Sequence, residues 1–97
     1  MATKALFVWI EAKPGDGDRV EDFLVWVRLL VEKESGTRTW LAVRLDASRF
    51  GILGAFADDA ALEAHLAGPI GKELTEKAVL FASPPQIVKL DVLTEKC

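Results

Sequence analysis

The sequence has no tyrosine and no asparagine, and it has only one cysteine, one histidine and one methionine among its 97 residues. The single cysteine, Cys97, has no second cysteine in the chain, so an intrachain disulfide is excluded and we expect a free thiol there. One histidine and one cysteine, without His-x-x-His or Cys-x-x-Cys spacing, also do not make the usual zinc sites. We therefore expect no bound metal.

Long apolar runs and clusters of basic residues are also missing. The apolar stretch near the start, from Ala5 to Ile10, is followed by Glu11 and is too short for a secretory leader or a membrane span. Twelve lysines and arginines are scattered among fifteen carboxylates, for a net charge of -3, and phosphate backbones need clustered positive charge. We expect a soluble, cytoplasmic protein that binds neither membranes nor nucleic acid.

The apolar content that is present is enough for one core. Hydrophobic residues make up 51% of the chain, and we expect one domain over residues 1–97. A chain of this length buries only roughly two-thirds of its unfolded surface, so its stability gains from self-association.

The spacing of apolar residues predicts four strands and three helices. Apolar positions alternate in the strands and recur every three or four residues in the helices. In order, we expect a strand over 5–13, a helix from 18 to before 36, strands over 37–46 and 50–57, a helix from 58 or 59 to 67, a helix from 69 whose apolar stripe ends at Phe81, and a strand around 88–92. This β-α-β-β-α(α)-β order is an α+β, ferredoxin-like fold with a four-stranded antiparallel sheet.

Local signals predict where the helices begin and end. Asp18, with Glu21 three residues later, is typical of a capping box at the start of the first helix. Gly36 is expected to end that helix in a left-handed conformation. Asp58 or Asp59 is expected to cap the second helix, because a carboxylate accepts hydrogen bonds from the free N–H groups there.

The first and third strands carry apolar residues on both faces, which is typical of central strands. Helices can cover only one face of a four-stranded sheet, and the other face would then be a larger apolar patch than monomers usually expose. We therefore expect a homodimer that pairs through the sheet face, with Val8 of the first strand on the paired face.

His65 is the one titratable residue placed to reach the interior. It lies three residues after Leu62 and one before Leu66, so it borders the inner stripe of the second helix. Two interpretations stay open: a packed, hydrogen-bonded histidine, or a general base or substrate anchor, since imidazole moves protons near neutral pH.

The strands also carry a set of aromatic residues. They form either core and dimer interface or the wall of a pocket for a small, flat apolar or phenolic ligand. The candidate wall residues are Phe7, Trp9, Trp40 and Phe56. Arg44, on the second strand, is either a solvated edge charge or a group that holds an anion.

Several short segments resemble the antibiotic biosynthesis monooxygenases. They are Lys13-Pro14-Gly15, Glu34-Ser35-Gly36, Phe56-Ala57-Asp58 and the run AALEAHL from Ala60 to Leu66, and the resemblance extends over about residues 5–93. It implies a dimeric α/β barrel of two ferredoxin-like subunits, each with a cavity between helices and sheet. Enzymes of this family oxygenate quinols or polycyclic phenols with dioxygen and no prosthetic group, and others degrade haem.

The haem-degrading branch does not fit this sequence. That branch has an asparagine in the first strand, a tryptophan in the third strand and a histidine in the third helix. Here Phe7 and Phe56 stand at the first two positions, and the third helix has no histidine. The resemblance therefore implies an activity without a cofactor, and it carries over His65, with Trp40 as a stand-in for the polar groups of the aromatic-hydroxylating branch.

Our hypothesis from the sequence is a cofactor-independent monooxygenase acting on a small aromatic phenol or quinol. His65 is the catalytic candidate. The substrate-binding candidates are Phe7, Trp9, Trp40, Arg44, Phe56 and Leu66. The alternative is a non-catalytic dimeric barrel that binds a small hydrophobic ligand or serves as an assembly unit.

Overall fold

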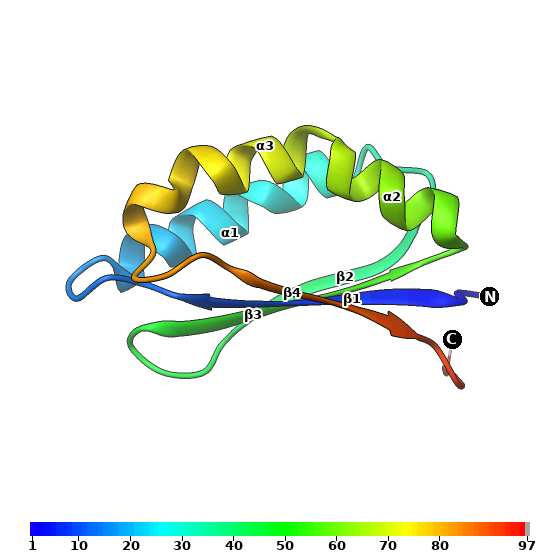
Figure 1. The fold of residues 1–97 in the computed structure, drawn as a ribbon, viewed down its shortest axis with the longest axis horizontal. Helices are drawn as coiled ribbons and strands as arrows, with labels where there is room; N and C mark the ends of the chain where they lie inside the picture. The colour runs from blue at the N-terminus through cyan, green and yellow to red at the C-terminus, as the bar shows by residue number, and fades with distance from the viewer. Residues whose placement is uncertain (97) are drawn as a thin grey trace.

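The computed structural model describes residues 1–96 and consists of one antiparallel sheet with helices on one face (Figure 1). The elements in chain order are β1 (Lys4–Glu11), α1 (Gly17–Val31), β2 (Thr37–Arg44), β3 (Arg49–Phe56), α2 (Asp59–Ala67), α3 (Pro69–Glu76), the short 3-10 helix η1 (Lys77–Leu80) and β4 (Gln86–Asp91). The strand order is β2-β3-β1-β4. The predicted ferredoxin-like fold is confirmed, with β1 and β3 central. Cys97, the predicted free thiol, lies outside the described residues.

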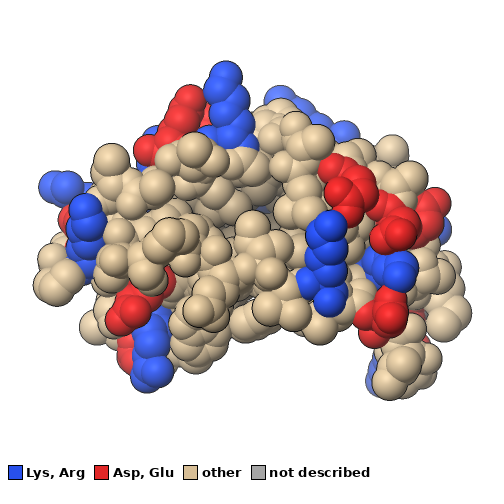
Figure 2. All heavy atoms as spheres, in the orientation of Figure 1, with Lys and Arg blue, Asp and Glu red and all other residues tan. Residues whose placement is uncertain are grey.

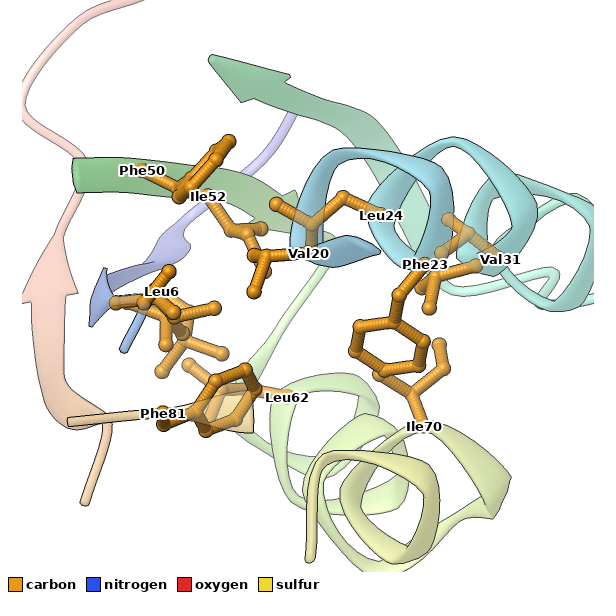
Figure 3. Packing of buried hydrophobic residues seen from close by; sticks show 14 of the residues in the cluster. Leu6, Val20, Phe23, Leu24, Val31, Phe50, Ile52, Leu62, Ile70 and Phe81 are labelled. Atoms are coloured by element: carbon orange, nitrogen blue, oxygen red, sulfur yellow. The ribbon is translucent and has the colours of Figure 1, made fainter. Parts of the chain in front are cut away.

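All three α-helices lie on the same side of the sheet, and the other side is left open (Figure 1). The core fills the space between the helices and the covered face. Figure 3 shows Phe23 of α1 near Ile70 of α3, and both residues are buried. In the same view Val20 of α1 lies near Ile52 of β3. Within residues 1–96, no helix combines the length and apolarity needed to cross a membrane.

The two faces of β1 are assigned by the packing of its neighbours. Val8 is 2% exposed and belongs to the core under the helices, so the prediction that Val8 lies on the paired face is wrong. Phe7 and Trp9 alternate with the core residues and therefore lie on the open face. A Cβ atom on Gly51 would lie 3.3 Å from the Phe7 ring, so this glycine leaves room for the ring on the open face.

The start of α1 differs from the prediction. The helix begins at Gly17 after Asp16, and no side-chain hydrogen bond caps it. Asp18 and Glu21 do not form a capping box, because both carboxylates accept hydrogen bonds from Nη1 of Arg44, at 3.1 and 3.0 Å. A long-range ion pair with β2 therefore replaces the local cap, and it ties the first turn of α1 to the sheet.

Gly36 and Phe81 also have roles that local signals did not predict. Gly36 has no positive φ angle, so it is not a left-handed stop. A Cβ atom on Gly36 would instead lie 2.6 Å from Cβ of Ala61 in α2, so the loop after α1 packs closely on that helix. Phe81 is not part of α3, because η1 intervenes and Phe81 pairs with Ala12 in an isolated β-bridge.

Candidate functional site

The position of His65 follows from how α2 begins. The Asp58 carboxylate accepts a hydrogen bond from the backbone N–H of Ala61 at 2.9 Å, which confirms the predicted cap. From that start, Leu62 and His65 both turn toward the sheet, one helical turn apart, and both are buried. His65 is only 5% exposed, and its imidazole lies over the ring of Phe56, with 4.9 Å between the ring centroids.

Glu34, in the loop between α1 and β2, holds the imidazole of His65. Nδ1 of His65 lies 2.6 Å from Oε1 of Glu34, and the same oxygen accepts a hydrogen bond from Oγ1 of Thr37 at 2.6 Å. An ionised carboxylate has no hydrogen to donate, so His65 donates through Nδ1–H. In the neutral imidazole, the second ring nitrogen, Nε2, then carries the lone pair, which can accept a proton.

Neither Glu34 nor Thr37 was a candidate from the sequence. Glu34 lies in the last turn of the helix that the sequence predicts to run to before residue 36, whereas α1 ends at Val31, and the contact joins residues 31 positions apart. The only signal was the Glu-Ser-Gly segment of the family resemblance, which does not say where the carboxylate points.

His65 lines a cleft of about 970 Å³. The walls come from the covered face of the sheet, from α2 and α3, and from the segment that leads into β4, and most of the side chains are apolar. Among them are Leu6, Val8, Ile52, Leu66, Ile70 and Leu74. In the space-filling view, the middle of this face, where helices and sheet meet, is largely uncharged, and charged side chains lie mainly at its ends and along the top (Figure 2). The cleft therefore has the size and polarity of a site for a small apolar ligand.

Three of the candidates from the sequence lie together in this cleft. His65, Trp40 and Leu66 all line it. Phe56 is fully buried beneath His65 and supports the imidazole rather than lining the cleft. The histidine and two apolar candidates are thus gathered at one place.

Three other candidates lie elsewhere. Phe7 and Trp9 are on the open face of the sheet, with 6.1 Å between their ring centroids, and do not line the cleft. Arg44 lines a second cleft of about 480 Å³ between α1 and β2. The structure does not bring these three side chains to His65.

Arg44 is engaged by its own surroundings. Its guanidinium binds both carboxylates of the first turn of α1 and donates to two backbone carbonyls of the β2–β3 turn. The guanidinium also lies over the ring of Phe50, with 5.1 Å between Cζ of Arg44 and the ring centroid. The hydrogen bonds with Glu21 and then Asp18 raise the pKa of Arg44 above its usual value. This arrangement explains Arg44 as a structural ion pair.

In residues 1–96, no group of three or more histidine, cysteine or acidic side chains is placed to hold a metal ion.

Among known proteins, solved structures are similar to this chain over nearly its whole length. The sequence matches no family model and no curated protein. The NE2512 protein of unknown function from Nitrosomonas europaea is 44% identical, with a TM-score of 0.96, and the match covers 100% of this chain and 95% of that one. PA3566 from Pseudomonas aeruginosa is 24% identical with a TM-score of 0.82, covering 97% of both chains. An antibiotic biosynthesis monooxygenase is 17% identical with a TM-score of 0.81, covering 94% of this chain and 99% of that one. At these last two identities the likeness is one of fold.

Proposed function

We propose that this chain, which belongs to the same family as the NE2512 protein of unknown function from Nitrosomonas europaea, is a cofactor-independent monooxygenase acting on a small aromatic phenol or quinol. Its fold, shared with an antibiotic biosynthesis monooxygenase, supports the class of reaction. The observation that carries the proposal is the contact between Glu34 and His65 at the wall of an apolar cleft.

His65 acts as the general base in this proposal. Its Nε2 takes a proton from the hydroxyl of a phenol or from the acidic ring carbon of the keto form. The imidazole becomes positively charged, and the Glu34 carboxylate at Nδ1 stabilises that charge. A positioned general base typically raises the rate by roughly 10²–10⁴-fold.

The deprotonated ring is electron-rich enough to reduce dioxygen directly. With anthrone as the substrate, the ring anion transfers an electron to dioxygen, and the two radicals combine to form a carbon–oxygen bond. His65 returns its proton to the peroxide anion and then removes the remaining hydrogen from the carbon that carries the peroxide. The carbon–hydrogen and oxygen–oxygen bonds break as the second carbonyl forms, and the departing hydroxide takes the proton from His65 and leaves as water. Anthrone and dioxygen thus give anthraquinone and water. Apolar walls keep bulk water away from the peroxide.

The test measures oxygen consumption with anthrone, comparing the wild type with His65→Gln. Glutamine keeps much of the volume and can still donate to Glu34, but it cannot take the proton. We expect a loss of turnover of about 10²-fold or more, with an unchanged circular dichroism melt. Val79→Ala is the matched control, because Val79 is 69% exposed and lies outside both clefts. Undiminished turnover by folded His65→Gln removes His65 from the mechanism.

A second candidate function is binding without turnover. The size and apolar lining of the cleft favour a small hydrophobic ligand whether or not chemistry follows. If anthrone and a set of quinols leave oxygen consumption at the protein-free rate while they still bind, this second function is the correct one.

We also propose that two copies pair through the open face of the sheet. All four strands contribute apolar side chains to that face. Those between 39% and 47% exposed are Leu41, Val43, Leu53, Val88 and Leu90. Pairing would bury this patch together with Phe7 and Trp9, and it leaves the cleft beside His65 on the opposite, helical side of each sheet.

A further inference from the structure

The cleft beside His65 has no acidic side chain in its walls. Within residues 1–96, none of the residues that line it is an aspartate or a glutamate, although the chain has fifteen of these and a net charge of -3. The smaller cleft between α1 and β2, in contrast, is lined by Glu21 together with its arginines. The walls around His65 therefore differ in charge from the chain as a whole.

Two lysines, Lys13 and Lys72, supply positive charge to these walls. Lys13 follows β1 and Lys72 lies on α3, and both are exposed. Neither lysine forms an ion pair with another of the residues 1–96. Lys89 of β4 is different, because its Nζ lies 2.7 Å from Oε1 of Glu63 on α2. The chain itself therefore leaves the two ammonium groups at the cleft without a counter-charge.

Lys13 and His65 lie toward opposite ends of this cleft. The backbone N–H of Lys13 donates to the carbonyl of Leu80 at the end of η1, at 2.9 Å. The loop that follows β1 and the helix α2 lie at opposite ends of the molecule (Figure 1). Between them runs α3, which carries Lys72, and its 8 residues span roughly 12 Å at 1.5 Å per residue. A ligand with one ring beside His65 would extend along α3 toward the two lysines.

We infer that the ligand of this cleft is an aromatic acid, whose carboxylate lies away from His65 and is bound by Lys13 and Lys72. The inference rests on the proposed function for which end of the ligand meets His65. A cleft lined by charge of one sign raises the local concentration of ligands of the opposite charge. Ion pairs at exposed sites are weak, so the apolar walls supply most of the affinity, and the lysines select acids over neutral compounds of the same shape.

The test compares anthraquinone-2-carboxylate with anthraquinone-2-carboxamide, which share the same rings and nearly the same shape and differ in charge. Trp40 lines the cleft, so quenching of tryptophan fluorescence reports binding. At neutral pH and low salt, we expect the carboxylate to bind about 3- to 10-fold more tightly than the amide. In about 0.5 M salt the difference should fall below about twofold, because salt screens charges at exposed sites.

Lys13→Gln and Lys72→Gln should each reduce this preference, and the double variant should bind the two probes with affinities within about twofold of each other. Lys33→Gln is the matched control for each single variant, because it removes the same charge from an exposed position that lines neither cleft. It should keep the wild-type preference. The inference is overturned if the wild type binds the amide as tightly as the acid or binds neither, if the double variant keeps the preference, or if Lys33→Gln loses it as fully as Lys72→Gln.

These outcomes are separate from those of the oxygen-consumption test, because both probes already carry the second carbonyl and consume no dioxygen. A lysine-dependent preference for the acid, without turnover of anthrone, would remove the monooxygenase proposal and keep the ligand class. Turnover of anthrone, with equal binding of acid and amide, would do the reverse.

Discussion

The Glu34 carboxylate, by accepting from Nδ1, decides which nitrogen of His65 carries the hydrogen. We predict that Glu34→Gln reverses this choice in part, because the amide can donate to Nδ1 and so favour hydrogen on Nε2. The chain has a single histidine, so ¹⁵N-histidine labelling gives one imidazole and reads the tautomer without assignment. The wild type should show hydrogen on Nδ1.

The kinetic counterpart is a fall in kcat of about 10-fold or more in Glu34→Gln with little change in KM, because the apolar walls that bind substrate are untouched. Thr37→Ser, which keeps the hydroxyl that donates to Glu34, serves as the control and should retain the wild-type tautomer and rate. A wild-type protein with hydrogen on Nε2 would contradict the assignment.

For single residues, the sequence predicts which face of a helix or strand a side chain occupies better than it predicts which side chains it contacts. His65 was expected on the inner side of α2, since its spacing from Leu62 and Leu66 follows the helical period, and it is buried there. Its partner Glu34 could not be predicted, because the carboxylate comes from a distant loop and no periodicity links the two. Arg44 was open to two interpretations, and only the folded chain reveals the carboxylates that surround it.

Among the elements, the turn between β2 and β3 contains a compact set of interactions around Asp46. The side-chain hydrogen bond from Arg49, at 2.7 Å, lowers the pKa of Asp46 to about 2, and the backbone N–H of Ser48 adds to the effect. Because the folded-state pKa is below the ordinary value of 3.8, the stabilisation is fully present above that value and is lost as the pH falls through about 2.

We predict that Asp46→Asn lowers the melting temperature at neutral pH, and that the difference from wild type shrinks between about pH 4 and pH 2. Circular dichroism melts over that range measure it. Asp22→Asn is the control, because within residues 1–96 Asp22 forms no ion pair and should show no such narrowing. If the melting temperature of Asp46→Asn is still as far below that of the wild type at pH 2 as at neutral pH, the ionised carboxylate is not what stabilises the turn.

The order of elements and the central place of β1 and β3 were predictable, because apolar residues on both faces mark central strands. The first turn of α1 was not, since the competing partner of Asp18 and Glu21 comes from β2. The end of α3 was misjudged for a similar reason: Phe81 continues the apolar spacing, yet pairing with Ala12 draws it into an extended conformation.

For the whole molecule, the prediction concerns assembly. We expect a native mass of two subunits, and Leu53→Glu, at the middle of the open face on β3, should weaken the pair by about 100-fold or more, because each copy would bury a charge. Leu53 is 39% exposed, so the change does not enter the core. Sedimentation at several concentrations measures it.

Val25→Glu is the matched control, since Val25 is 69% exposed on α1, on the other side of the sheet, and the variant should remain paired. A wild type that sediments as one subunit at all concentrations, or a Leu53→Glu variant that stays paired, contradicts the assignment of the face. The sequence indicated that one face of β1 is left over, but Phe7, Val8 and Trp9 are all apolar, so alternation alone did not say which.

The contact between Gly36 and Ala61 sets how far the loop that carries Glu34 can stand from the helix that carries His65. The two groups of the candidate site are thus spaced by a point where nothing larger than a hydrogen atom fits. A methyl group on residue 36 would push the loop away from α2 and so lengthen the contact between Glu34 and His65. Under the proposed mechanism, substitution at this one loop position, which does not line the cleft, would therefore change the activity through the geometry of the Glu34–His65 contact alone.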